Sequence, residues 1–174
     1  PHAVRASVYI GGFWIRQAKE LNMKRLLGLL LGMVWGGGPL RKLGATIHPL
    51  VGEVVSVDLV DTQVTDVELV HLAGLTNLKS LSLPKQITDA GLVHLKGLTN
   101  LAVINLEDTK VTDAGLVHLK DLTNLRTLDL SKQITDAGLV HLKGLTGLQE
   151  VYLQQTQVTD AGLVHLKELT GLQE

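Results

Sequence analysis

The chain has 174 residues, of which 45% are hydrophobic, 3% are aromatic and 36 are leucine. This composition is too apolar for a disordered chain, and too poor in aromatic residues for a typical surface that stacks sugar rings or unpaired bases. The formal net charge of −1 gives no general attraction for a polyanion, and the lack of cysteine excludes disulfides, thiolate metal sites and cysteine nucleophiles.

The segment before the repeats contains a pattern typical of an export signal. Residues 23–25 are Met-Lys-Arg, residues 26–35 are an apolar run, and residues 36–38 are three glycines. These are the three regions of a signal peptide, and the run is far shorter than the ~20 residues of a membrane-spanning helix. We therefore expect residues 23–38 to direct secretion, or delivery to the periplasm or cell envelope. The alternative is a buried helix in a cytoplasmic protein, which the glycines disfavour.

The flanking segments have different expected roles. If Met23 starts translation, residues 1–22 are an upstream segment of doubtful status, and because Pro1 is no initiator we expect the sequence to be a fragment. Residues 39–53 suit a small amino-terminal cap. Residues 54–174 are expected to form five repeats and the beginning of a sixth.

The repeats have a period of 23 or 24 residues. A Thr-Asp pair recurs five times at alternating steps of 23 and 24, and units two and three together are echoed by units four and five. A fixed period of this length predicts a solenoid whose neighbouring units bury one continuous core. The units are residues 54–77, 78–100, 101–124, 125–147 and 148–171.

Each unit combines a strand pattern with a helix pattern. In unit two, Leu81 and Leu83 alternate with serines, which is typical of a strand with one buried face. Leu92, Leu95 and Leu98 then recur every three residues, which predicts a short helix with one apolar face.

Polar residues at the ends of these elements suggest caps and turns. Thr88 or Asp89 is suited to cap the helix of unit two, because its side-chain oxygen can accept a hydrogen bond from an unpaired backbone N–H. The glycine two residues after each aspartate is Glu68 in unit one, so this position is not expected to require glycine. Left-handed turns are expected at the unit ends, where Asn or Gly recurs: Asn77, Asn100, Asn124, Gly147 and Gly171.

These units resemble the leucine-rich-repeat family, whose signature is L-x-x-L-x-L-x-x-[N/C/T]-x-[L/I/V]. Residues 101–111 fit it, with Ile104 at the second leucine position. The Thr-Asp-Ala-Gly-Leu continuation is similar to bacterial repeats and, apart from its lack of cysteine, to those of F-box adaptor proteins. The resemblance implies an α/β solenoid with a curved parallel sheet on the concave side and short helices on the convex side. No F-box is visible upstream, so no ubiquitin-ligase role is carried over.

Threonine occupies the family's ladder-forming position in units one, three and five, at Thr62, Thr109 and Thr156. A buried hydroxyl needs a partner, and we expect backbone of the neighbouring coil to supply it. Units two and four lack one residue between strand and helix and therefore lack this threonine. The predicted ladder alternates, with Gln86 not equivalent to Thr109.

Strand positions that alternate with the leucines predict a solvent-facing grid, here called the concave strand face. Its three rows are Ser56, Ser80, Val103, Thr127 and Glu150; Asp58, Ser82, Asn105, Asp129 and Tyr152; and Val60, Pro84, Glu107, Ser131 and Gln154. The grid has four acids, no Lys or Arg, and Tyr152 as an aromatic anchor. The expected ligand is a protein or peptide, although an idle solvated surface would show the same pattern. The predicted contact residues are Asp58, Ser82, Asn105, Glu107, Asp129, Glu150, Tyr152 and Gln154.

A repeated His–Asp constellation suggests acid–base or metal chemistry at first sight. It consists of His71, His94, His118, His141 and His165 with Asp66, Asp89, Asp113, Asp136 and Asp160. Equivalent residues on neighbouring helices lie about 8–10 Å apart, whereas zinc binds imidazole nitrogen at about 2.0–2.1 Å. No nucleophile elbow, phosphate loop or zinc-protease motif occurs. We expect no catalytic residue, metal or cofactor.

The predicted function is therefore an exported, non-catalytic binding module without a stable membrane span. Nucleic acid is not expected as a partner, because the repeated lysines are interspersed with acids. The alternative is the recognition arm of a larger protein whose enzymatic or signalling domain lies beyond Glu174. Fraying or self-association is expected at the carboxyl end, where the layer of Leu148 and Leu153 would be partly uncapped.

Overall fold

The structure is a computed structural model that describes residues 7–10, 13–16 and 54–173. Its strands are β1 (Ser7–Ile10), β2 (Phe13–Arg16), β3 (Val54–Asp58), β4 (Ser80–Ser82), β5 (Val103–Asn105), β6 (Thr127–Asp129) and β7 (Glu150–Tyr152). Its helical segments are η2 (Asp66–Leu72), α2 (Asp89–Leu92) with η3 (Val93–Leu95), α3 (Asp113–Leu116) with η4 (Val117–Leu119), α4 (Asp136–Leu139) with η5 (Val140–Leu142), and α5 (Asp160–Leu163) with η6 (Val164–Leu166). The expected signal peptide and cap, at residues 23–53, lie outside the described residues.

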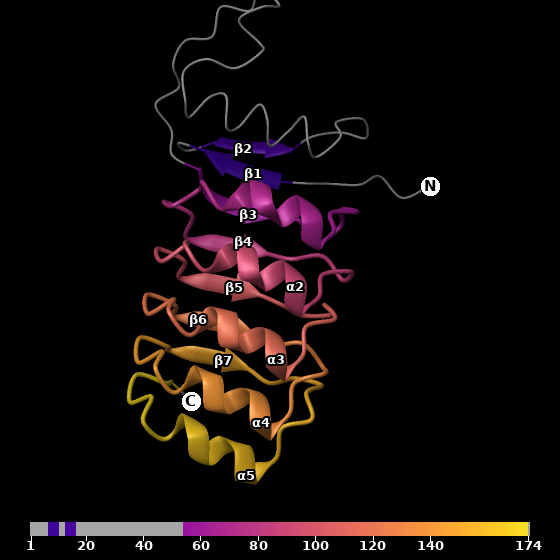
Figure 1. Cartoon of the computed structure of the whole chain (residues 1–174). Coiled ribbons are helices and arrows are strands. Elements are labelled where there is room, and N and C mark those ends of the chain that lie inside the picture. Colours follow the sequence, from indigo (N-terminus) through magenta and orange to yellow (C-terminus); the bar gives the residue numbers. More distant parts are fainter. Residues whose placement is uncertain (1–6, 11–12, 17–53, 174) are drawn as a thin grey trace, which may run out of the picture.

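One sheet in the order β2-β1-β3-β4-β5-β6-β7 joins the described strands. Strands β3 to β7 are parallel, and each is followed by the short helical segment of its unit. Figure 1 shows the coils stacked in chain order, with helices forming a layer beside the sheet. The predicted α/β solenoid is confirmed.

Strands β1 and β2 form an antiparallel hairpin, and β1 pairs antiparallel with β3. The hairpin therefore covers the edge of the sheet that the first repeat would otherwise present (Figure 1). The repeat pattern predicted no strand here, because these residues share no period with the units that follow.

The core is the aliphatic spine of the repeats. Leu81, Ile104 and Leu128, at equivalent positions of three adjacent strands, are 0% exposed. Burying such a side chain stabilises a fold by about 1.5–3 kcal/mol. Val151, their equivalent in unit five, is only partly buried and packs against this core.

The carboxyl end differs from the expectation at one residue. Leu148 is 0% exposed, so the prediction that its layer is partly uncapped was wrong for this residue. Leu153 is only partly buried, as expected, and Leu163 and Val164 are 44% and 52% exposed. Self-association through this end stays a prediction.

In units two to five the helical segment is a four-residue α-helical turn that continues as a three-residue 3₁₀ turn. The three-residue spacing of the leucines matches the 3₁₀ period. The Thr88 hydroxyl accepts a hydrogen bond from the N–H of Ala90 (3.3 Å), and Thr135 and Thr159 cap their helices in the same way. Thr112 makes no such bond.

The aspartate of each Thr-Asp pair joins its coil to the next. The carboxylate of Asp66 accepts hydrogen bonds from the backbone N–H and the hydroxyl of Thr88, at 2.9 and 2.6 Å. Three further pairs repeat this geometry at 2.6–2.9 Å: Asp89 with Thr112, Asp113 with Thr135, and Asp136 with Thr159. The Thr-Asp motif is therefore an inter-coil ladder.

The ladder also explains the glycine that follows each aspartate in units two to five. A Cβ on Gly91 would lie 2.5 Å from Oδ1 of Asp66, and at Gly115, Gly138 and Gly162 it would lie 2.2–2.3 Å from the aspartate of the preceding coil. Such contacts are too short for a side chain, so the expectation that this position does not require glycine was wrong for these units.

Unit one has Glu68 at the glycine position because the described ladder begins in that unit. Its carboxylate accepts hydrogen bonds from the N–H and the hydroxyl of Thr65, at 2.9 and 2.6 Å. These are the same two donor groups that bond the preceding coil's aspartate in later units. Glu68 thus supplies from within unit one the acceptor that Asp66 supplies to unit two.

The threonine hydroxyls bond differently from the prediction. Each donates to the carbonyl oxygen three residues earlier in its own coil: Thr62 to Leu59, Thr109 to Leu106 and Thr156 to Leu153, at 2.6–2.7 Å. The expected bond to the neighbouring coil was wrong, because the longer turn brings the hydroxyl back to its own strand. The shorter units bridge coils instead: the Gln86 amide donates to the carbonyls of Thr62 and Val64, and the Ser131 hydroxyl to that of Val111.

The unit ends are not left-handed. Among the described non-glycine residues, positive φ occurs only at Asp108 (56°) and Gln155 (61°), in the longer turns of units three and five. Asn100 and Asn124 instead donate their side-chain amides to carbonyls of the preceding coil, at 2.9 and 2.8 Å. The prediction of left-handed turns was therefore wrong for all five unit ends: Asn77, Asn100, Asn124, Gly147 and Gly171.

Candidate functional site

The first two rows of the concave strand face form as the repeat spacing predicts. Strand pairing aligns Ser56, Ser80, Val103, Thr127 and Glu150 in one row, and Asp58, Ser82, Asn105, Asp129 and Tyr152 in the other. All ten side chains are at least partly exposed. Six of the eight predicted contact residues therefore lie in two adjacent rows across five strands.

The third row is solvent-facing only in the longer units. Glu107 and Gln154 are exposed in the turns after β5 and β7, whereas Pro84 and Ser131 are buried. The prediction that these two face solvent was wrong. Units two and four lack one turn residue, so the chain enters the helix sooner and this position turns inward, where the Ser131 hydroxyl bonds the Val111 carbonyl.

An aromatic and acidic cluster occupies the face at units four and five. Tyr152 is 40% exposed, and its hydroxyl donates to Oε2 of Glu150 at 3.2 Å. The same oxygen accepts a hydrogen bond from the Thr127 hydroxyl at 3.3 Å. The charge of Glu150 and this hydrogen bond raise the pKa of Tyr152. The phenol is thus held by its hydroxyl while much of its surface stays available for contact.

Asp129 lies beside this cluster, directly across from Tyr152 on the next strand. Burial raises the pKa of Asp129, and the nearby Glu107 carboxylate raises it further. Negative charge is therefore concentrated on this part of the face. A partner that brought positive charge would relieve the repulsion between these carboxylates.

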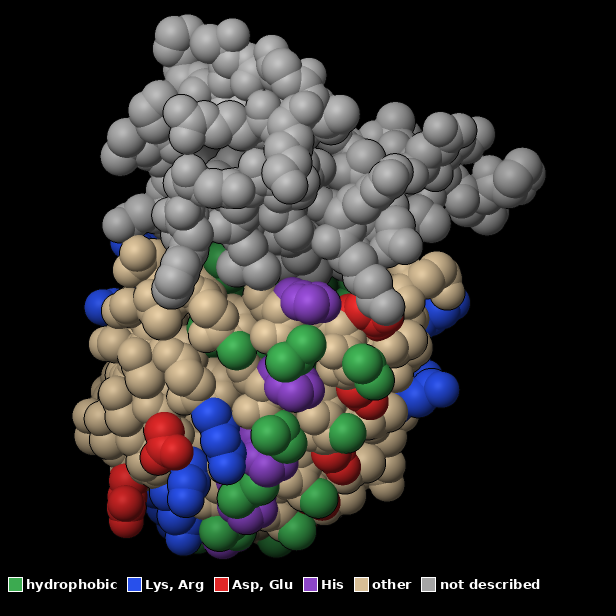
Figure 2. All heavy atoms as spheres, turned by 45° about the horizontal axis from the view of Figure 1, so that its top comes forward, with side chains coloured by type: hydrophobic (Ala, Val, Ile, Leu, Met, Phe, Trp, Pro, Cys, Tyr) green, Lys and Arg blue, Asp and Glu red, His purple; other side chains and the backbone are tan. Residues whose placement is uncertain are grey.

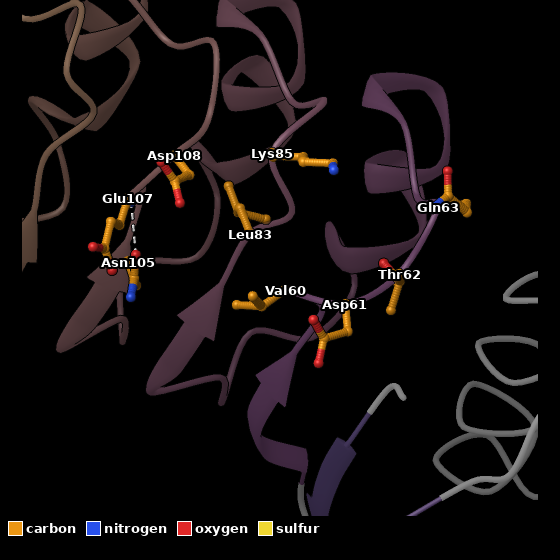
Figure 3. Close-up of a pocket in the computed structure, with 9 residues that line it drawn as sticks. All are labelled: Val60, Asp61, Thr62, Gln63, Leu83, Lys85, Asn105, Glu107 and Asp108. Atoms are coloured by element: carbon orange, nitrogen blue, oxygen red, sulfur yellow. Dashed lines mark hydrogen bonds between the residues drawn. The ribbon is translucent and has the colours of Figure 1, made fainter. Parts of the chain in front are cut away.

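A cavity of about 340 Å³ lies at the edge of the face, over unit two. We call it the unit-two notch. Figure 3 shows its lining, which comes from the turn of unit one, the shorter turn of unit two, and β5 with the turn of unit three: Val60, Asp61, Thr62, Gln63, Leu83, Lys85, Asn105, Glu107 and Asp108. Sequence reasoning missed most of these residues as site residues. The alternation between 23- and 24-residue steps was the signal that could have located the notch, because a short turn between two longer ones leaves a gap.

The His–Asp constellation is divided between two roles. Four of its five aspartates, those of units one to four, accept the inter-coil bonds of the ladder. The histidines are gathered in one column on the helix side of the solenoid (Figure 2). In the part of the chain that the structure describes, no group of three or more His, Asp or Glu side chains is placed to hold a metal ion.

Within residues 7–10, 13–16 and 54–173, no helix combines the length and the apolar character that a membrane span requires.

Two solved structures similar to this chain are internalins of Listeria monocytogenes. Internalin C2 matches with a TM-score of 0.55 and 39% identity over 66% of this chain and 47% of its own. A second internalin (inlF) matches with a TM-score of 0.57 and 26% identity over 68% of this chain and 33% of its own. This chain therefore spans less than half the length of either. No family model matches the sequence, and no curated protein matches it. The likeness identifies the fold as a leucine-rich-repeat solenoid.

Proposed function

We propose that this chain is a non-catalytic protein- or peptide-binding leucine-rich-repeat module whose partner contacts the concave strand face. Stacked repeats create extended inner surfaces that such proteins use for binding. The likeness to internalins supports a protein-binding repeat module.

The observation that carries the proposal is that the residues that build the core and the ladder are separate from those that form the concave strand face. The leucines and the Thr-Asp pairs that recur in every unit are used by the fold: the leucines fill the core, and the Thr-Asp pairs build the ladder. The middle row of the strand face changes along the array, and its residues lie outside the buried core cluster. It also exposes Tyr152, an aromatic residue of the type that is enriched at binding hot spots.

The test compares matched substitutions in the full chain. Glu150→Gln and Tyr152→Ala alter the face, whereas Glu168→Gln removes the same charge from an exposed position beyond η6. Biotinylated protein is cross-linked in native extract, and captured proteins are quantified by mass spectrometry. We expect a partner retained by Glu168→Gln but reduced about tenfold by Tyr152→Ala, as for a hot-spot residue. A partner captured equally by all variants would place binding elsewhere.

For location we propose export, with residues 23–38 as the signal peptide, to the medium, periplasm or cell envelope. Cleavage would also remove β1 and β2, so the hairpin that pairs with β3 would belong only to the uncleaved chain. Without export the module would act in the cytoplasm. The intact mass of the native product tests this, since a mature chain that retains residues 26–35 contradicts export by cleavage.

The alternative is the recognition arm of a larger protein with an enzymatic or signalling domain. Its support is that both internalins are longer than this chain, which covers 47% and 33% of them. Sequencing the native transcript past residue 174 tests it.

A further inference from the structure

The unit-two notch is a cavity with charged walls, and Val60 is its exposed apolar residue. Leu83 and Val60 lie between Asp61 on one side and Asp108 on the other (Figure 3). Its volume of about 340 Å³ lies in the range of about 300–1,000 Å³ typical of ligand pockets. The notch opens beside Asn105, so it adjoins the middle row of the concave strand face.

The charges of the lining do not balance. Three acids, Asp61, Glu107 and Asp108, line the notch with one base, Lys85. Asp108 has a φ of 56°, a conformation that Asp and Asn tolerate better than most residues, and its side chain is drawn between those of Glu107 and Leu83 in Figure 3. The side chain of Lys85 extends toward the turn of unit one instead (Figure 3).

The second half of the array provides an internal comparison. The 47-residue spacing relates units one, two and three to units three, four and five, so each lining position has a counterpart 47 residues later. Gln63 corresponds to Lys110, and the acids Glu107 and Asp108 correspond to Gln154 and Gln155. The counterpart positions over unit four hold two acids and two lysines. The turn-length pattern is repeated, but the excess of negative charge is specific to unit two.

We propose that the unit-two notch receives one arginine or lysine side chain of the protein partner that binds the concave strand face. This rests on the proposed function. Val60, which is 49% exposed, contacts the aliphatic part of the side chain, and the carboxylates of Asp61 and Asp108 accept hydrogen bonds from its cationic group. Arginine suits two carboxylates better than lysine, because its planar fork donates in several directions. The notch thus selects for a cationic residue of the partner at units one to three, while Tyr152 contacts the partner from β7 on the same sheet.

The probe is N-acetyl-arginine amide, titrated into the ¹⁵N-labelled full chain and followed by amide chemical shifts. N-acetyl-citrulline amide, which has the same shape without the charge, is the matched control. We expect saturable shifts at residues 60–63, 85 and 105–108 with the arginine probe and none with citrulline. Equal shifts with both probes, or shifts spread over all surface carboxylates, would overturn the proposal.

Variants of the full chain locate the contact. Asp61→Asn with Asp108→Asn should weaken probe binding about fivefold or more, as expected for two exposed charge pairs, and Asn keeps the positive φ at residue 108. Lys85→Gln should strengthen it. The control pair Asp121→Asn with Glu168→Gln changes the net charge equally, at exposed positions outside the notch, and should have little effect. An equal loss in the control pair would mean that only the overall charge attracts the probe.

The outcome is separable from that of the proposed function. If the probe does not bind the notch while Tyr152→Ala still abolishes partner capture, the notch proposal is wrong and the binding module stands. If partner capture is unaffected by Tyr152→Ala, the module loses its support whatever the probe does.

Discussion

Replacing Gly115 with alanine tests whether the inter-coil ladder explains the repeated glycine. A Cβ here would lie 2.3 Å from Oδ1 of Asp89 and 3.0 Å from Cγ1 of Val111. To relieve the clash, Asp89 must move and weaken its two bonds to Thr112, each 2.7 Å long. Overpacking costs about 1–3 kcal/mol, and alanine regains about 0.5–1 kcal/mol over glycine in a helix. With some loss of the two bonds, we expect a net destabilisation of about 1–3 kcal/mol.

The assay is urea unfolding of the full chain, followed by far-ultraviolet circular dichroism, for Gly115→Ala, Asp89→Ala and the double variant. Without the carboxylate, only the 3.0 Å contact with Cγ1 of Val111 opposes the new methyl group, so Gly115→Ala should cost about 1 kcal/mol less than in the parent chain. Gly97→Ala is the control, because a Cβ there meets no atom within 4 Å. If Gly115→Ala costs the same in both backgrounds, or no more than Gly97→Ala, the ladder does not explain the glycine.

Three further outcomes follow from the same contacts. Leu128→Ala should lower the free energy of unfolding by ~2–5 kcal/mol in urea, because the side chain is 0% exposed. Glu68→Gly should cost about 0.5–2 kcal/mol in the same assay by removing the acceptor of Thr65, and an unchanged urea midpoint would contradict that role. The pKa of Asp136 is lowered below 3.8, mainly by the hydrogen bond from the backbone N–H of Thr159. The ionised carboxylate therefore stabilises the folded chain fully above pH 3.8, and this stabilisation is lost as the pH falls through the lowered pKa. Thermal melts across the acid range should show a shallower decline for Asp136→Asn than for the parent chain.

The spine and the strand register could be predicted from the sequence because both depend on simple periods. Leu81 and Leu83 alternate with serine, so one face of β4 must be buried. The next unit repeats the pattern after 23 residues, and parallel pairing then aligns Leu81 with Ile104. A shift by one residue would expose the leucines, so no other register is compatible with a buried core.

The polar contacts could not be predicted in the same way, because a polar side chain can bond locally or to a neighbouring coil at similar cost. Thr62 and Gln86 illustrate both outcomes: the hydroxyl bonds its own turn, and the amide reaches the preceding coil. The choice depends on the length of the turn and on the reach of the side chain. Neither the period nor the hydropathy of the repeat records these distances.

The ladder clarifies why a glycine position could be misjudged from the sequence. Glu68 suggested that the position tolerates a long side chain, and in unit one it does. The steric constraint on Gly91 comes from Asp66, which lies 25 residues earlier in the preceding coil. The constraint therefore acts only in units whose preceding coil contains such an aspartate. The residue found at an equivalent position of each unit therefore depends on the side chains of the preceding coil as well as on its own backbone.

The same distinction determines where function can reside. A side chain that bonds the next coil, such as Asp89, cannot change without loosening the stack, and a side chain in the spine cannot change without leaving a cavity. Tyr152, Glu107 and Asp61 carry neither constraint, since they point away from the core and bond no neighbouring coil within the described residues. The one-residue difference in turn length also creates the unit-two notch, because the shorter turn of unit two lies between two longer turns. The inter-coil ladder is the same in both kinds of unit. A partner can therefore be selected by residues that the solenoid does not need for folding, and substitutions there should alter binding while the urea midpoint stays constant.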